Sequence, residues 1–88
     1  MIELFERLEL DKNSDTPLYL QLYRKLKDMI LEGLLLPEFR LPSIRQLADA
    51  LDVNQVTVVS AYKQLESEGL IYKRPGSGTY VNNTLGVP

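Results

Sequence analysis

Apolar side chains recur at helical spacing between residues 18 and 30. On a helical wheel, one arc of about 140° holds Leu18, Tyr19, Leu22, Tyr23, Leu26, Met29 and Ile30. Thr16 is a suitable N-cap, Pro17 suits the first helical position, and Gly33 is a typical stop signal. The pattern therefore predicts a helix that ends near Glu32 and buries this arc.

A second run of apolar positions follows a helix-start signal. Ser43 and Gln46 have the spacing of a capping box. The apolar stripe behind them consists of Ile44, Leu47, Ala48 and Leu51. The next helix is predicted over residues 55–68, with Asn54 as its cap. The core face of this helix is expected to carry Val58, Ala61, Tyr62 and Leu65.

The turn between these two helices is only a few residues long. Asp52 lies where a tight turn needs a positive φ angle, which aspartate tolerates better than most residues. Ala48 is small where two helices would cross closely, and Val53 and Val58 are expected to fill the angle between them. This spacing predicts a helix-turn-helix.

Two strands are predicted after the helices. Residues 70–74 and 79–82 are rich in β-branched and aromatic side chains, and the Pro-Gly-Ser-Gly run at 75–78 has turn chemistry. A very short strand is expected at 39–41, and residues 1–12 are expected to form a short helix or an extended arm. The predicted fold is mainly α with a small β-hairpin, a winged helix-turn-helix.

The 88 residues suffice for one small domain. We expect residues 1–15 to be an N-terminal arm and residues 16–82 to be the winged helix-turn-helix domain. Residues 83–88 are expected to begin a linker to an effector domain that this sequence does not include.

The chain contains no cysteine and no histidine. It therefore has no disulfide and no thiolate zinc site, and it lacks the commonest general base and metal ligand. No apolar run is long enough to cross a membrane. We expect a cytoplasmic protein that is not an enzyme, holds no metal or cofactor in this chain and does not bind a membrane.

The charge is unevenly distributed. The formal net charge of −2 does not by itself indicate a nucleic-acid partner. Residues 1–39 hold five basic and eight acidic side chains, whereas residues 40–88 hold five basic and four acidic ones. The basic side chains of the second half are Arg40, Arg45, Lys63, Lys73 and Arg74. This weak basic footprint coincides with the predicted helix-turn-helix.

The helix predicted over residues 55–68 has an exposed face suited to a DNA groove. This face carries Val56, Thr57, Ser60, Lys63 and Gln64, and the first acidic residue of the helix is Glu66. The cations that flank it, at the start of the preceding helix and at the wing, are Arg45, Lys73 and Arg74. These features predict sequence-specific DNA binding. A winged helix that binds only proteins would use the same face and is the alternative.

A series of short motifs runs through residues 14–82. They are Pro17-Leu18-Tyr19 with Gln21, Leu41-Pro42-Ser43 with Arg45, Leu47 and Ala48, then Val53, Thr57-Val58, Ala61-Tyr62, Leu65, Glu68-Gly69-Leu70 and the Gly-Ser-Gly-Thr-Tyr-Val run at 76–81. In this order and spacing, the motifs resemble the GntR-type bacterial transcription regulators. The resemblance implies an N-terminal winged helix joined to a separate effector or dimerisation domain, and binding to operator DNA as a dimer.

The resemblance also implies which residues contact DNA. Arg45 matches a contact position at the start of a helix. Asn54, Gln55 and Thr57 match contact positions at the start of the recognition helix, and Gly76 matches the wing-tip glycine that enters the minor groove.

The chain departs from the family pattern at two positions. Many members have arginine where this chain has Gln55, so base preference there is expected to differ; glutamine suits adenine. Many have glycine where this chain has Glu38, so the turn before the short strand is expected to differ.

The arm at residues 10–14 and the pair Ala61-Tyr62 resemble the MocR subgroup more than the YtrA subgroup. The MocR resemblance implies an aminotransferase-like effector domain that binds pyridoxal phosphate and lies outside these residues. A YtrA-like protein would instead carry a short helical dimerisation tail. In both cases the expected partner is double-stranded operator DNA, bound by a homodimer of the full-length protein.

Overall fold

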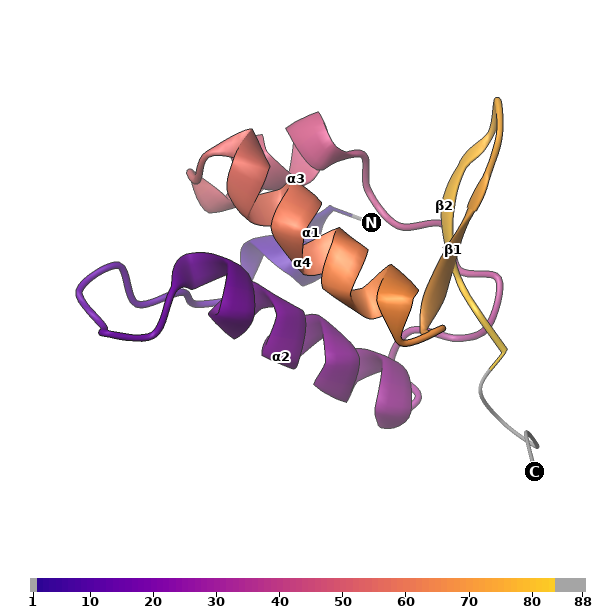
Figure 1. The fold of residues 1–88 in the computed structure, drawn as a ribbon, viewed down its shortest axis with the longest axis horizontal. Coiled ribbons are helices and arrows are strands. Elements are labelled where there is room, and N and C mark those ends of the chain that lie inside the picture. The colour runs from indigo at the N-terminus through magenta and orange to yellow at the C-terminus, as the bar shows by residue number, and fades with distance from the viewer. Residues whose placement is uncertain (1, 84–88) are drawn as a thin grey trace.

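Four helices and one hairpin make up residues 2–83, the part of the chain that the computed structural model describes (Figure 1). The elements in chain order are α1 (Glu3–Glu6), α2 (Leu18–Leu31), α3 (Ile44–Leu51), α4 (Gln55–Ser67), β1 (Ile71–Arg74) and β2 (Gly78–Val81). α4 packs against both α2 and α3, and the hairpin closes its C-terminal end. The expected linker, beyond residue 83, lies outside the described residues.

The core lies between α2, α4 and the inner side of the hairpin. The side chains that α2 buries are Leu22, Tyr23, Leu26, Met29 and Ile30. The predicted arc was too wide, because Leu18 is half-buried and Tyr19 is 38% exposed. A tyrosine presents an apolar ring and a polar tip, so its partial exposure in the first helical turn is ordinary.

The N-terminal arm contributes to this core. Phe5 of α1 is 1% exposed, and its ring centroid lies 6.2 Å from that of Phe39. Further along the arm, the Asp11 amide donates to Oε1 of Gln21 at 2.8 Å, and Nε2 of Gln21 donates to the Asp11 carbonyl at 3.0 Å. The arm therefore packs on the same body as the helices that follow it.

The start of α2 differs from the prediction. Pro17, with ψ 144, is the N-cap residue and stands outside the helix, and Thr16 does not cap it. The Thr16 carbonyl instead accepts a hydrogen bond from Nε2 of Gln21 at 2.8 Å. The same glutamine thus bonds both the arm and the residue that precedes the N-cap of α2.

The link between α2 and α3 runs antiparallel beside β2. Backbone hydrogen bonds of 2.7–2.9 Å join residues 38–41 to residues 79–81. The strand expected at 39–41 is reduced to one bridge, between Arg40 and Tyr80. It is this short because the chain turns just before it and reaches Pro42, which has no amide donor, just after it.

Glu38 causes the turn before the bridge. Its φ angle is 70, in the left-handed region that costs a residue with a side chain about 1–2 kcal/mol. The glutamate therefore adopts a backbone conformation that glycine takes without strain.

The hairpin is fixed at its base. Ile71 and Val81 are partners across the two strands, and both are buried in the core. Nδ2 of Asn82 donates to the Gly69 carbonyl at 3.1 Å, which ties the end of β2 to the end of α4. The strands begin or end within one residue of the predicted limits, and Gly78 belongs to β2 rather than to the turn.

Candidate nucleic-acid interface

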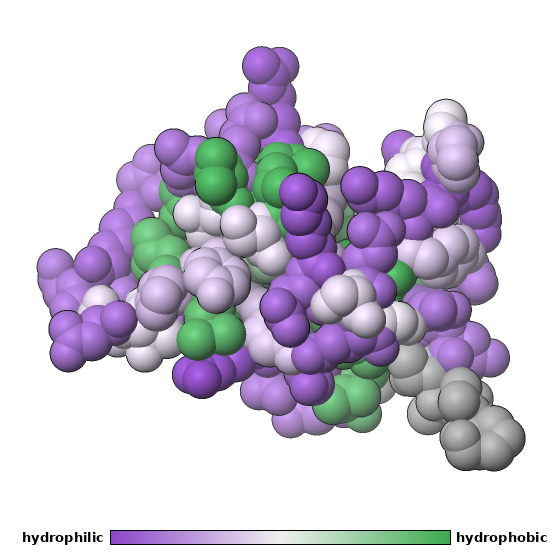
Figure 2. Space-filling model, viewed as in Figure 1, coloured by the Kyte–Doolittle hydropathy of each residue, from purple (hydrophilic) through white to green (hydrophobic). Residues whose placement is uncertain are grey.

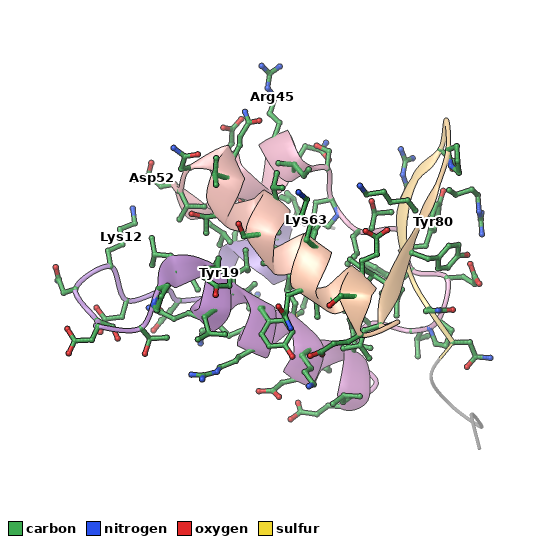
Figure 3. All side chains as sticks on the ribbon, in the orientation of Figure 1. Lys12, Tyr19, Arg45, Asp52, Lys63 and Tyr80 are labelled. Carbon is green, nitrogen blue, oxygen red and sulfur yellow. The ribbon has the colours of Figure 1, made fainter. Side chains whose placement is uncertain are left out.

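The turn between α3 and α4 has the predicted backbone. Asp52 has φ 54, and the Val53 amide donates to the Ala48 carbonyl at 3.0 Å. Nζ of Lys12 donates to the Asp52 carbonyl at 2.7 Å and lies 3.3 Å from its carboxylate (Figure 3). A cation at the C-terminal end of a helix is favourable. The arm therefore helps to fix the direction in which α4 leaves α3.

The inner face of α4 is anchored by apolar packing and by hydroxyl groups. The predicted row Val58, Ala61, Tyr62 and Leu65 is buried. The Tyr62 hydroxyl donates to the Pro42 carbonyl at 2.7 Å, and burial raises the pKa of Tyr62. The Tyr23 hydroxyl donates to the carboxylate of Glu68, and this bond is the main reason why the pKa of Glu68 is lowered. These bonds hold α4 at its middle and at its C-terminal end, and its opposite face is turned outward.

The first two turns of the outward face of α4 carry no charged side chain. Val56 is 66% exposed, the highest value among the large hydrophobic side chains of the described residues. Gln55 is exposed, whereas Thr57 and Ser60 are half-buried. No carboxylate occurs between residues 54 and 65. The structure therefore brings these predicted contact residues together on the first turns of one helix.

Asn54 has a structural role at its predicted contact position. It is the N-cap residue of α4, with ψ 144, and its Oδ1 accepts a hydrogen bond from the Val56 amide at 2.8 Å. Its Nδ2 has no partner among the described residues. One atom of the side chain is thus committed to the helix, and the other faces solvent.

Replacing Asn54 by alanine should lower the free energy of unfolding by about 1 kcal/mol, because the first turn of α4 loses its side-chain acceptor. Replacement by aspartate, which also caps, should cost much less. Urea denaturation of both variants measures the difference. Equal losses in the two variants would mean that the cap is not what stabilises this turn.

Arg45 is the second residue of α3 and lies opposite the buried side of that helix. The helix start itself is confirmed as a capping box, since Ser43 and Gln46 exchange two hydrogen bonds of 3.1 Å. The Arg45 side chain is exposed and reaches away from the body of the protein (Figure 3). It has no ion pair among residues 2–83.

The hairpin tip is open. Gly76 has φ 77, and a Cβ atom placed on it would meet nothing within 4 Å. The Ser77 amide donates to the Arg74 carbonyl at 2.9 Å, which closes the turn. The tip and the start of α3 point toward the same side of the molecule (Figure 1). The backbone at Gly76 is therefore accessible to a partner that also meets α3.

The two predicted cations of the wing lie on opposite faces of the hairpin, because successive side chains of a strand alternate. Lys73 is exposed and has no ion pair in the described part of the chain. Arg74 lies 3.0 Å from a carboxylate oxygen of Glu38, and its guanidinium stacks 4.3 Å from the centroid of the Tyr80 ring. The structure thus leaves Lys73 unpaired and holds Arg74 in a cluster.

Two further cations near this surface were not among the predicted contacts. Lys63 follows Val56 by seven positions, and this spacing already places both on the outward side of α4. Arg40 lies across β2, where a Cβ on Gly78 would be 3.0 Å from its Nε. Its place depends on the pairing with β2, for which the sequence carries no local signal.

The surface formed by the start of α3, the outward face of α4 and the wing offers cations and hydrogen-bonding groups. Within residues 2–83 no helix could span a membrane, and no three carboxylates are grouped to hold a metal ion. Figure 2 shows hydrophobic groups scattered among hydrophilic ones, without one continuous apolar patch on the side in view.

Comparison with known proteins agrees with this geometry. The family model described as bacterial regulatory proteins, gntR family, matches residues 18–81. The HTH-type transcriptional repressor YtrA of Bacillus subtilis (strain 168) is 41% identical over 75 residues, which are 85% of this chain and 58% of that protein. The solved DNA-binding domain of AraR in complex with operator ORX1 has a TM-score of 0.74 and 29% identity, and covers 84% of this chain and 95% of its own.

The comparisons do not favour the MocR subgroup. The probable rhizopine catabolism regulatory protein MocR of Rhizobium meliloti is 45% identical over 74 residues, which are 84% of this chain and 15% of that protein. The identity to YtrA is similar over nearly the same number of residues. The chain spans 58% of YtrA and 15% of MocR. The effector domain that binds pyridoxal phosphate therefore stays a prediction. At the level that all the matches share, the chain belongs to the gntR family of bacterial regulatory proteins and has the winged helix-turn-helix fold.

Proposed function

We propose that this chain is the sequence-specific DNA-binding domain of a bacterial transcription regulator, with α4 in the major groove and the hairpin tip at the minor groove. The observation that carries the proposal is the outward face of α4, which has no carboxylate over its first turns. The cations that flank or share this face and have no ion pair within residues 2–83 are Arg45, Lys63 and Lys73. Lysine and arginine side chains that neutralise phosphates supply most of the affinity for a duplex.

The dimensions suit this partner. α4 has 13 residues, and at 1.5 Å per residue it is about 20 Å long. The major groove of B-DNA, about 12 Å wide, admits such a helix. A similar fold is found in complex with operator DNA in AraR. This complex supports DNA over the alternative of a winged helix that binds only proteins.

Each exposed group at the start of α4 has a chemical role in the proposal. The Gln55 amide can bond N6 and N7 of adenine, and Val56 can contact a thymine methyl group. Thr57 and Ser60 supply hydroxyls for phosphates or base edges. At the wing, Gly76 allows the backbone to approach the minor groove.

We also propose that the regulator acts as a homodimer, because helix-turn-helix dimers read two half-sites about one helical turn apart. The YtrA relative is longer than this chain, which covers 58% of it, so the full-length product is the protein to test. The mass of its complex with a selected duplex should correspond to two chains. A complex with one chain would contradict the proposal.

Changing Arg45 to alanine should weaken DNA binding and leave the fold intact. The side chain is exposed, so its loss should change the free energy of unfolding by about 0.5 kcal/mol or less. If it contacts a phosphate, affinity should fall on all sequences, and the slope of log affinity against log salt should shrink by about one unit. Fluorescence anisotropy at several salt concentrations measures both quantities.

The matched control is Arg24→Ala, which removes the same charge from an exposed position on α2. Its salt slope should stay at the wild-type value. A loss for Arg45→Ala that is confined to one sequence would show that the guanidinium reads a guanine instead. Unchanged binding with an unchanged melting temperature would remove Arg45 from the interface.

A further inference from the structure

The hairpin tip needs support beyond its own backbone. Each strand has four residues, and an isolated two-stranded hairpin is marginally stable in water. The base is secured by the buried pair Ile71 and Val81, and the link joins β2 as far as Thr79, whose carbonyl accepts a hydrogen bond from the Leu41 amide at 2.8 Å. The orientation of residues 75–77 therefore depends on side chains of the outer face.

A polar and aromatic cluster occupies that outer face. Tyr72 and Tyr80 are partners across the strands, with ring centroids 6.0 Å apart. The Arg74 guanidinium lies 4.3 Å from the centroid of Tyr80 and donates to the Tyr72 hydroxyl at 2.6 Å. The Glu38 carboxylate accepts hydrogen bonds from both the Tyr72 hydroxyl and Arg74, the latter at 3.0 Å.

The cluster extends to the tip. The hydroxyls of Ser77 and Tyr80 are hydrogen-bonded to each other, and the Ser77 amide donates to the Arg74 carbonyl. A continuous series of contacts thus leads from Glu38, in the link before α3, to the turn that carries Gly76.

Two properties of Glu38 are unexpected for a merely solvated side chain. Its backbone has the positive φ of 70 that glycine adopts without strain, and such strain persists where surrounding contacts over-determine it. Its carboxylate also places a negative charge beside the wing, which is proposed to approach DNA phosphates. A glutamate without contacts would leave the backbone strain and the unfavourable negative charge uncompensated.

We infer that Glu38 is a positioning residue for the wing, which holds the hairpin tip through Arg74, Tyr72 and Tyr80 in the pose that meets the minor groove. In this arrangement Arg74 braces the wing with its planar fork rather than contacting a phosphate. The inference rests on the proposed function, because it concerns the same DNA surface.

The first test is Glu38→Gly, assayed against a pool of random-sequence duplex DNA at low salt. The melting temperature should not fall, because glycine relieves the strained φ. Affinity should nevertheless fall about three- to tenfold, since the tip must be ordered on binding. Hydrogen exchange at the amides of Gly76 and Ser77 should accelerate. Glu38→Gln keeps a side chain at this position, so the backbone strain remains while the carboxylate is lost. Its affinity for DNA should also fall.

The sign of the effect separates positioning from simple charge. Glu32→Gln is the matched control, because it removes one negative charge from an exposed residue at the end of α2. Charge alone predicts equal or tighter binding for every one of these variants. Tight binding by Glu38→Gly with unchanged exchange at the tip would overturn the inference and leave the proposed function standing. Failure of the wild-type chain to bind the pool would overturn both.

Arg74→Lys directly tests the contacts of Arg74 with Glu38, Tyr72 and Tyr80, which we call the brace. Lysine keeps the charge for a phosphate contact and loses the planar fork that joins the carboxylate, the hydroxyl and the ring. The brace predicts a loss of affinity as large as that of Glu38→Gly, and no additional loss when both changes are combined. Wild-type affinity for Arg74→Lys would overturn the inference and return Arg74 to the DNA contacts.

Discussion

Replacing Phe5 by alanine should lower the free energy of unfolding by about 3–5 kcal/mol, the usual cost of deleting a buried phenylalanine side chain. The ring is 1% exposed and packs against Phe39, and α1 also contacts α3. The free energy of unfolding of a native domain is about 5–15 kcal/mol in total. The melting temperature should therefore fall by more than about 10 °C, as measured by circular dichroism.

The neighbouring residue Leu4 provides the control, because it lies in the same short helix and is 38% exposed. Leu4→Ala should cost well under half as much as Phe5→Ala. Similar small losses in the two variants would show that the arm is dispensable for the core, despite the packing of Phe5.

Changing Gln55 to alanine should remove about 1–3 kcal/mol of base discrimination at one base pair. Gln55 is the first residue of α4, is exposed, and has no side-chain partner among the described residues. Affinity for unrelated sequences should hardly change, because phosphate contacts by other residues supply it. Selection of bound duplexes from a random pool, with wild type and variant in parallel, measures the preference at every position.

The matched control is Gln64→Ala, which removes the same side chain from the far part of α4, where it bonds Glu68 at 3.3 Å. The base preferences of this variant should remain those of wild type. If Gln55→Ala binds every duplex more weakly by the same factor, then Gln55 positions the backbone and does not read a base.

The features that could be predicted from the sequence depend on neighbours within four residues. The capping box of Ser43 and Gln46, the cap at Asn54 and the left-handed Asp52 are all present in the structure. A capping side chain reaches only the next turn, so its partner is fixed by spacing. The buried row of α4 was also predicted, because helical periodicity defines a face before its partner is known.

The start of α2 was predicted one residue too early. Thr16 has the chemistry of a cap, yet Pro17 is the N-cap residue, and no side chain bonds the first turn. The Thr16 carbonyl accepts a hydrogen bond from Gln21, whose side chain also bonds Asp11 ten positions earlier. Local propensity ranks Thr16 as a cap without taking these contacts into account.

At the candidate site, helical periodicity predicts which side chains α4 and the start of α3 turn outward, since the buried stripe of each helix fixes its opposite face. The partner of each charged side chain depends on tertiary packing. Lys12 reaches Asp52 across 40 positions, and Arg74 reaches Glu38 across 36. Such pairs carry no periodic signal, because they arise where packing brings distant segments side by side. The wing thus has one unpaired cation, Lys73, and one held in a cluster, Arg74, although the two are adjacent in the chain.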